Sequence, residues 1–324
     1  MLTISAEDID RAFDFAELVD TLRTWFRDGA VQPVRHHHLV ERPDGAASTL
    51  LLMPAWSDFA AAGTSDGGFV GVKIVTVSPD NNLIGKPSVA GVYLLMDGRT
   101  CEPLALIDGQ RLTLWRTACA SALASTYLSR PDSRRLLVIG AGALAPFLAQ
   151  AHAALRPIEA ISIWNRTAAN AERIAAQLRA EGLAAQAVDD LDRAMAEADI
   201  ITAATISTVP LVKGAALKPG THVDLVGAFS PAMRESDEAA FSRSRVYVDT
   251  RAGAVKEAGD VVQAIAEGAI RLEDIQGDLF ELARGTVAGR QSADEITLFK
   301  SVGAAIEDLA AATLAYAKVS GQAP

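Results

Sequence analysis

The chain has 324 residues, enough for about two domains at roughly 150 residues each. Half of its residues are hydrophobic, which excludes intrinsic disorder as the main description. Forty acidic and thirty basic residues give a formal net charge of −10, which argues against nucleic-acid and anionic-membrane partners. Without an apolar run of about 18 residues or a basic N-terminal leader, we expect a cytoplasmic protein with no membrane span.

The first third of the chain predicts one helix followed by hairpin-linked strands. Asp14 can cap a helix whose apolar residues recur three or four positions apart until Gly29 ends it. Alternating apolar residues and turn residues then mark strands. The predicted strands are His36–Glu41, Ser48–Met53, Gly68–Val77, Val89–Met96 and Leu104–Asp108. Successive hairpins predict an antiparallel or mixed sheet, and with the helix an α+β domain.

A helical period begins at Leu112 and runs to Pro131, and strands and helices alternate after it. The predicted strands there are Arg135–Ile139, Ala160–Trp164, a short one near Ala187, Ile200–Ala204, His222–Gly227 and Arg245–Asp249. Helices are predicted at 142–155, 168–183, 192–198 and, at the end of the chain, 297–319. This alternation predicts an α/β domain of the Rossmann type, with a doubly wound parallel sheet. We place it at residues 116–299 and the α+β domain at 1–115 and 300–324.

A glycine-rich turn follows the first strand of the alternating region. Its pattern is G-x-G-x-x-A between an apolar strand and a helix. In such turns the first Gly allows the tight bend, the second lets the backbone approach a pyrophosphate, and the helix N-terminus supplies free N–H groups. The residues predicted to bind a dinucleotide are Gly140, Ala141, Gly142, Ala143, Leu144 and Ala145.

The end of the next strand decides which dinucleotide is preferred. An NAD-binding protein commonly places Asp or Glu there, to accept from the ribose 2′-hydroxyl. This chain has Asn165, Arg166 and Thr167 instead, and a guanidinium can bind a 2′-phosphate. We therefore expect NADP(H) to be preferred, with NAD(H) possible.

Cations in apolar settings of the first domain are candidates for holding an anionic substrate. Lys73 lies within an apolar strand and Arg116 within an apolar helix, and each needs an anion if it is buried. A substrate carboxylate in a cleft between the domains is one such anion, and a structural salt bridge is the alternative. Arg35 is a third candidate.

Other chemistries have weaker signals. The side chains of His36, His37 and His38 would alternate between the two faces of a strand, so the three cannot converge on one metal ion. We found no nucleophile elbow and no Cys/His pairing, and we expect Cys101 and Cys119 to be small buried residues. Hydride transfer remains.

Several spaced motifs identify a family resemblance. They are Gln32-Pro33-Val34-Arg35, Met53-Pro54, Gly71–Val75, Leu112-Thr113 with Arg116-Thr117-Ala118, and Phe299–Gly303 with Glu307-Asp308. In this order, together with the glycine motif, they resemble the ornithine cyclodeaminase/mu-crystallin family over nearly the whole chain. The resemblance implies a homodimer whose first domain, completed by the C-terminal helix, forms the dimer sheet. It also implies a nicotinamide cofactor and a carboxylate-binding set of Arg35, Lys73 and Arg116.

Two departures from the family pattern bear on the reaction. Where the resemblance to true cyclodeaminases would place Glu and Asp, this chain has Leu51 and Phe229, which cannot carry a proton. Gly227-Ala228-Phe229-Ser230-Pro231 instead resembles the members that reduce cyclic ketimines. The resemblance then implies substrate-pocket residues Met53, Phe229 and Ser230, and cofactor contacts from Thr205, Gly227 and Lys300.

The expected function is NADPH-dependent reduction of delta-1-pyrroline-2-carboxylate to L-proline and of delta-1-piperideine-2-carboxylate to L-pipecolate. One methylene separates the two rings, so the sequence does not choose between them. The proton donor also stays open, with Lys73, Ser230 and Thr205 as candidates. The alternatives are an ornithine cyclodeaminase or amino-acid dehydrogenase of the same family, and a non-catalytic NADP-dependent binding protein like mu-crystallin.

Overall fold

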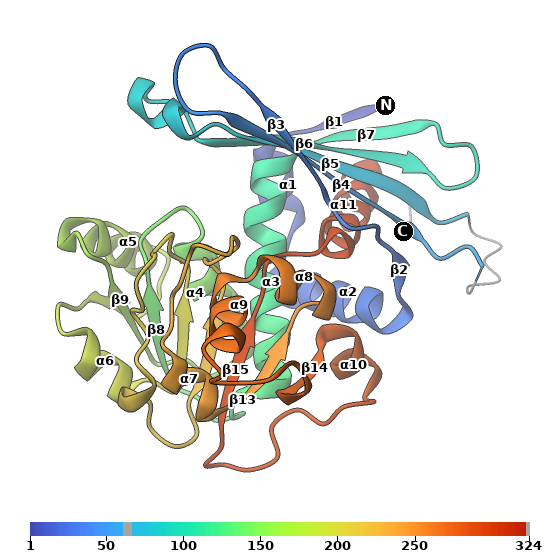
Figure 1. Ribbon diagram of the computed structural model, residues 1–324. Helices are drawn as coiled ribbons and strands as arrows, with labels where there is room; N and C mark the ends of the chain where they lie inside the picture. Colours follow the sequence, from blue (N-terminus) through green and yellow to red (C-terminus); the bar gives the residue numbers. More distant parts are fainter. Residues whose placement is uncertain (61–66, 322–324) are drawn as a thin grey trace. The chain divides into compact units, whose positions relative to one another are not determined.

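The computed structural model describes residues 1–60 and 67–321 and divides into two compact units (Figure 1). The first unit is Met1–Thr117 with Ala304–Pro324, and the second is Ala118–Gly303. The sequence had placed the boundaries after residues 115 and 299. Residues 322–324, within the range predicted for the first domain, lie outside the described residues.

The first unit is built on a mixed sheet. Its order is β1-β7-β6-β5-β4-β2, and β3 also pairs with β4. All pairs are antiparallel except β1 with β7, so of the two sheet types that the sequence left open, this sheet is the mixed one. The strands are β1 Leu2–Ile4, β2 Ala30–Val31, β3 His36–Val40, β4 Ser48–Ser57, β5 Phe69–Val77, β6 Val89–Asp97 and β7 Pro103–Asp108.

Helices α2 (Phe15–Asp28) and α11 (Ala305–Ser320) pack against each other, and α11 also contacts β4, β5 and β6. The Asp14 side chain caps α2 by accepting from the Glu17 N–H, and Gly29 ends the helix at φ +91°. Also in this unit are α1 (Ala6–Ala12) and the 3-10 helix Pro79–Ile84, while α3 (Gly109–Leu128) begins here and continues into the second unit.

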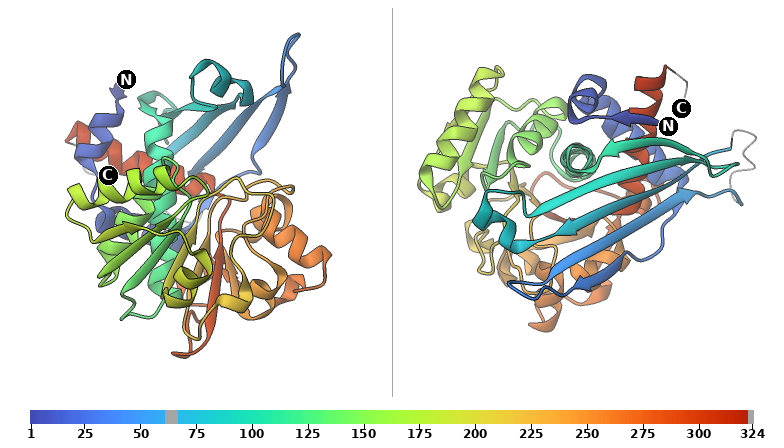
Figure 2. Two further views of the ribbon diagram at one scale, coloured as in Figure 1. Left: turned by 90° about the vertical axis from the view of Figure 1, so that its left-hand side faces the viewer. Right: turned by 90° about the horizontal axis from the view of Figure 1, so that it is seen from above.

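The two faces of the first sheet differ in burial. Residues of one face are buried, including Met53, Ala55, Tyr93 and Leu95. The opposite face is apolar but partly exposed, and Figure 2 (right) looks onto it with no described helix of the first unit in front of it. Its cross-strand rows are Leu52-Ile74-Val92, Pro54-Val72-Leu94-Leu106 and Trp56-Val70-Met96.

The second unit contains an eight-stranded, wholly parallel sheet in the order β10-β9-β8-β11-β12-β15-β13-β14. The chain moves one way from β8 to β10 and the other way from β11, so the switch point lies between β8 and β11. This confirms the Rossmann-type fold. The strands are β8 Arg135–Ile139, β9 Ala160–Trp164, β10 Ala185–Ala187, β11 Ile200–Ala203, β12 His222–Leu225, β13 Ser244–Val248, β14 Ile275–Asp278 and β15 Ile296–Lys300.

Helices α4 to α9 give apolar side chains to two buried clusters. The helices of this unit are α4 Ala145–Leu155, α5 Ala168–Ala180, α6 Leu191–Glu197, α7 Glu238–Ser242, α8 Arg251–Glu257, α9 Gly259–Ala266 and α10 Leu279–Arg284, with 3-10 turns at Gly214–Ala216 and Leu272–Asp274.

Two expectations from the sequence were wrong. The predicted helix at 297–319 is the strand β15 followed, from Ala305, by helix α11. The residues of β15 are all buried between β12 and β13, so their apolar pattern reflects a central strand rather than a helix face. Cys101 is exposed, not buried, in a turn where its φ is +58°.

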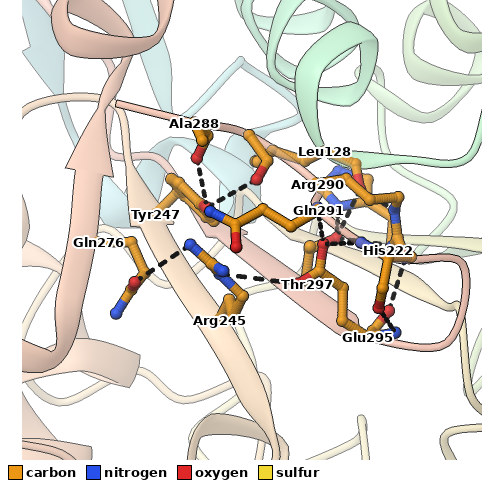
Figure 3. A network of polar contacts seen from close by, with 12 residues as sticks. Leu128, His222, Arg245, Tyr247, Gln276, Ala288, Arg290, Gln291, Glu295 and Thr297 are labelled. Carbon is orange, nitrogen blue, oxygen red and sulfur yellow. Dashed lines mark hydrogen bonds and ion pairs between the residues drawn. The ribbon is translucent and has the colours of Figure 1, made fainter. Parts of the chain in front are cut away.

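A polar network fixes the edge of the second sheet at which the strands begin (Figure 3). Arg290 donates to the carbonyls of Leu128, Thr221 and Glu295, and to the Thr297 hydroxyl. The Nδ1 of His222 lies 2.9 Å from the same hydroxyl, and burial holds the pKa of His222 well below its usual range. This buried histidine is therefore a neutral part of the scaffold.

Candidate active site

The predicted dinucleotide-binding residues of the second unit lie at or just beyond the carboxyl ends of its strands. Gly140 follows β8, Asn165 follows β9, Thr205 lies just beyond β11, Gly227 just beyond β12, and Lys300 ends β15. Because all these strands are parallel, their ends meet at one edge of the sheet. This is the edge where open α/β sheets bind ligands, so the fold brings residues separated by up to 160 positions to one site.

The glycine turn has the backbone and the free space that a pyrophosphate needs. Gly140 has φ +110°, and a Cβ there would meet the Ala204 carbonyl oxygen at 2.7 Å. A Cβ on Gly142 would have no atom within 4 Å, so this glycine leaves open space beside the loop. Helix α4 begins at Ala145, and Arg173 of α5 supports the turn by donating to the Ala141 carbonyl. The described residues therefore fit a dinucleotide.

The residues expected to contact the adenosine ribose are accessible. Arg166 and Thr167 are exposed, and Asn165 is half-buried between them and β9. The Asn165 amide donates to the Thr167 carbonyl, which fixes the turn that begins α5. The structure thus leaves the Arg166 side chain in solvent at the edge of the sheet where the cofactor is expected.

Glu235 joins the loops that follow β11 and β12, and no pattern in the sequence had marked it as a site residue. Its Oε1 accepts from the Thr205 N–H at 2.6 Å and from the Thr205 hydroxyl at 2.9 Å. Its Oε2 accepts from the N–H groups of Gly227 and Ala228 at 2.6 and 3.2 Å. A Cβ on Gly227 would lie 2.0 Å from the Thr205 carbonyl oxygen, so only glycine allows this approach.

Lys300 is fully buried beneath these loops, which changes its expected role. Its Nζ lies 3.3 Å from Asp260 Oδ2 and 3.8 Å from Glu235 Oε2. Asp260, at the start of α9, accepts from the N–H groups of Glu235 and Ser236. With no exposed surface, the ammonium of Lys300 cannot contact a cofactor directly; it supports the two carboxylates.

Apolar side chains border the same loops. Phe229 is 47% exposed, so it is not an ordinary core residue of the unit. Ile206 and Val209, in the loop after β11, are exposed as well, and Ser230 is half-buried. Exposed apolar side chains beside backbone loops can exclude water from a bound ligand.

The first unit holds a buried ionic cluster around the predicted carboxylate-binding cations. Lys73 Nζ donates to Asp308 Oδ1 at 2.8 Å, Arg116 Nε donates to the same oxygen at 3.0 Å, and Arg116 Nη1 donates to Glu307 Oε2 at 2.6 Å. Both carboxylates belong to the first turn of α11. The cations, which the sequence showed to need anions, thus already have them within the chain.

The pKa values of the two cations in this cluster shift in opposite directions. Burial and the neighbouring Arg116 lower the pKa of Lys73 to about 8, against the attraction of Asp308. Burial alone would lower the pKa of Arg116, but Asp308 and Glu307 outweigh it and raise that pKa. Arg35 is half-buried and close enough to contribute to the lowering at Lys73. Lys73 can therefore exchange a proton near neutral pH, whereas Arg116 stays charged.

Met53 lies beside Lys73 in the sheet. The two residues are register partners on β4 and β5, and Tyr93 of β6 is the next partner in the row. Met53 is 4% exposed and Tyr93 is fully buried, and burial raises the pKa of the Tyr93 hydroxyl well above its usual range. The row holds the Lys73 stem in an apolar setting.

Two further findings concern absent features. Residues 1–60 and 67–321 contain no group of three or more His, Cys, Asp or Glu side chains that could hold a metal ion. Within the same residues, no helix has both the length and the apolar character to cross a bilayer.

Comparisons with known proteins find similarity along nearly the whole chain. The model of the ornithine cyclodeaminase/mu-crystallin family matches residues 4–323. Delta(1)-pyrroline-2-carboxylate reductase of Paracoccus denitrificans is 38% identical over 292 residues, covering 89% of this chain and 91% of that protein.

Two solved structures are similar over 99% of the chain. One is Thermococcus litoralis Delta(1)-pyrroline-2-carboxylate reductase in complex with NADH and L-proline, 98% covered, with a TM-score of 0.91 and 33% identity. The other is an archaeal alanine dehydrogenase dimer with bound NAD, 97% covered, with a TM-score of 0.88 and 26% identity. The chain belongs to the ornithine cyclodeaminase/mu-crystallin family.

Proposed function

We propose that the protein reduces cyclic ketimines that carry a carboxylate, with NADPH preferred over NADH. The products are L-proline from delta-1-pyrroline-2-carboxylate and L-pipecolate from delta-1-piperideine-2-carboxylate. The observation that carries the proposal is the buried Lys73–Arg116 pair, in a chain similar along its length to a reductase whose structure holds NADH and L-proline.

In this proposal the cations of the first unit bind the substrate. Arg116 stays charged while it pairs with Glu307 and Asp308, and together with Arg35 it also attracts the substrate carboxylate. Each ion pair at about 4 Å gains on the order of 4 kcal/mol at an effective dielectric near 20, before desolvation. That energy is enough to orient a small ring.

The reaction adds a hydride to the imine carbon and a proton to the imine nitrogen. A reduced nicotinamide cofactor supplies the hydride when it is bound. Lys73, with its pKa of about 8, supplies the proton from Nζ and then regains one from solvent. Phe229 packs on the ring methylenes and excludes water.

The residues of the second unit support cofactor binding. The turn at Gly140–Ala145 holds the pyrophosphate, with Thr205 and Gly227 nearer the nicotinamide end. NADPH preference rests on the exposed Arg166 and on the absence of a carboxylate at the end of β9. NADH remains usable, because the glycine turn binds the part that the two cofactors share.

We also propose that the protein is a homodimer. The partly exposed apolar face of the first sheet is unusual for a monomer. The archaeal alanine dehydrogenase to which this chain is similar is a dimer.

The deciding experiment follows NADPH and NADH oxidation with both cyclic imines. Pyruvate with ammonia or methylamine serves as the comparison, because the likeness to alanine dehydrogenase favours an amino-acid dehydrogenase as the second candidate. Ornithine is tested separately with NAD for ammonia release. Rapid ammonia release would contradict the argument from Leu51 and Phe229, and reduction of pyruvate alone would favour the second candidate.

A further inference from the structure

At the carboxyl edge of the second sheet, the Glu235 side chain joins the ends of two loops. The loop after β11 presents Thr205 and the loop after β12 presents Gly227 and Ala228. Neither loop has a strand partner at this point, yet four donors from them converge on the Glu235 carboxylate. A Gly227 Cβ would lie 2.3 Å from the Thr205 nitrogen, so the loops approach closely here.

We infer that Glu235 is a positioning residue that sets the two loops receiving the nicotinamide end of the cofactor. In a doubly wound fold one half of the sheet binds the adenosine end and the other half binds the nicotinamide end. Here β8, β9 and β10 form the first half, and the loops that Glu235 joins belong to the second. The inference rests on the proposed nicotinamide-dependent function.

Only the ionised side chain can accept all four bonds. Each carboxylate oxygen accepts two donors, and a proton on either oxygen would face one of them. Lys300 from β15 and Asp260 from α9 face the same group, and Asp260 also fixes the Glu235 backbone N–H. The neighbouring Arg234 guanidinium is engaged with Glu267.

Near neutral pH, Glu235 exchanges between its protonated and its ionised form. Burial raises the pKa of Glu235 to about 7, with Lys300 opposing the rise and Asp260 adding to it. Protonation breaks at least one of the four bonds and loosens one loop. Binding at the nicotinamide end should therefore strengthen as the pH rises through about 7 and Glu235 ionises.

The test compares two probes on Glu235→Gln. NADH carries the nicotinamide ring, whereas ADP-ribose keeps the adenosine and pyrophosphate but lacks it. An amide presents one acceptor oxygen and one donor nitrogen, so it loses two of the four bonds in either orientation. We expect the NADH dissociation constant to rise about tenfold or more and that of ADP-ribose to change by less than about threefold.

Two further variants complete the design. Glu172→Gln, an exposed residue of α5 paired with Arg179, should leave both dissociation constants unchanged. Glu235→Asp keeps the charge and should recover part of the NADH affinity. Equal weakening of NADH and ADP-ribose, or no change in either, would overturn the inference.

Both probes are measured without an imine, so failure of the proposed ketimine reduction would not affect this result. If Glu235→Gln does not fold, the unmodified protein supplies the test through pH. NADH should bind more tightly above pH of about 7 than below it, while ADP-ribose binding stays constant. A pH-independent NADH affinity would then overturn the inference.

Discussion

At the scale of single residues, Arg166 is the side chain expected to select between cofactors. Its guanidinium is exposed at the end of β9, where only NADPH presents a 2′-phosphate. In Arg166→Ala we expect the NADPH dissociation constant to rise about tenfold or more, because a charge-assisted contact of about 1.5–3 kcal/mol is lost. The NADH value should change little. Equal losses for both cofactors, in paired titrations, would show that Arg166 does not read the phosphate.

Arg116 donates to two carboxylates of α11, those of Glu307 and Asp308. This geometry predicts that lysine cannot replace Arg116. Arg116→Lys keeps the charge but cannot reach Glu307 and Asp308 from one planar group. We expect kcat/KM for the imine to fall about tenfold or more, through a raised KM, with NADPH affinity unchanged. Arg111→Lys, on the same helix but partly exposed, is the matched control. Normal imine saturation in Arg116→Lys would exclude Arg116 from substrate binding.

Lys73 gives a prediction about pH. Its pKa of about 8 means that the ammonium is present below pH 8 and lost above it. If it donates the proton, kcat/KM for the imine should fall as the pH rises through about 8. In Lys73→Arg the charge persists at all these pH values, so activity should be low and this fall should disappear. An unchanged profile in that variant would assign the proton to another donor.

At the scale of elements, the β8–α4 turn offers a matched pair of glycines. Gly140→Ala places a Cβ at positive φ and 2.7 Å from a carbonyl oxygen, so it should lower the free energy of unfolding by about 1–3 kcal/mol. Gly142→Ala meets no protein atom, so stability should be kept while cofactor affinity falls. Thermal unfolding and NADH titration of both variants check this. Full cofactor affinity in Gly142→Ala would place the pyrophosphate elsewhere.

Helix α11 shows how an element can combine two roles. Glu307 and Asp308 lie in its first turn, where negative side chains stabilise the helix through its dipole. The same two carboxylates also pair with Lys73 and Arg116. Removing one partner from a buried ion pair costs about 3–5 kcal/mol, so variants in this cluster need a stability measurement beside each kinetic one.

At the scale of the whole molecule, the partly exposed apolar face of the first sheet is the proposed homodimer interface. Val72 and Leu94 are register partners on that face. Leu94→Asp would leave an unpaired charge in a buried interface, so light scattering should show monomers instead of dimers. Leu272→Asp, at an exposed position in the second unit, should leave the mass unchanged. A monomeric unmodified protein would contradict the homodimer directly.

Local patterns in the sequence determined much of this protein. Period-two and period-3.6 patterns located most strands and helices, because each element must bury an apolar face. The glycine turn was found because its backbone geometry requires particular residues at fixed spacing, and the family followed from motifs spread over the chain. The sequence also predicted that Lys73 and Arg116 need anions, since an apolar sequence around a charged residue indicates that the charge is buried.

Only the tertiary structure decided which residues meet. From the sequence alone, Glu307 and Asp308 had no assigned role, because their partners lie about 190 or more residues away in the chain. Glu235 and Asp260 carried no local signal, because only the fold brings them to Thr205 and Lys300. Residues 297–300, which the sequence pattern had assigned to a helix, form a strand instead, because they pair with β12 and β13. Lys300 likewise changed from an expected cofactor contact to a buried support. Long-range pairing and burial are set by the packing of distant segments, and no short stretch of sequence specifies them.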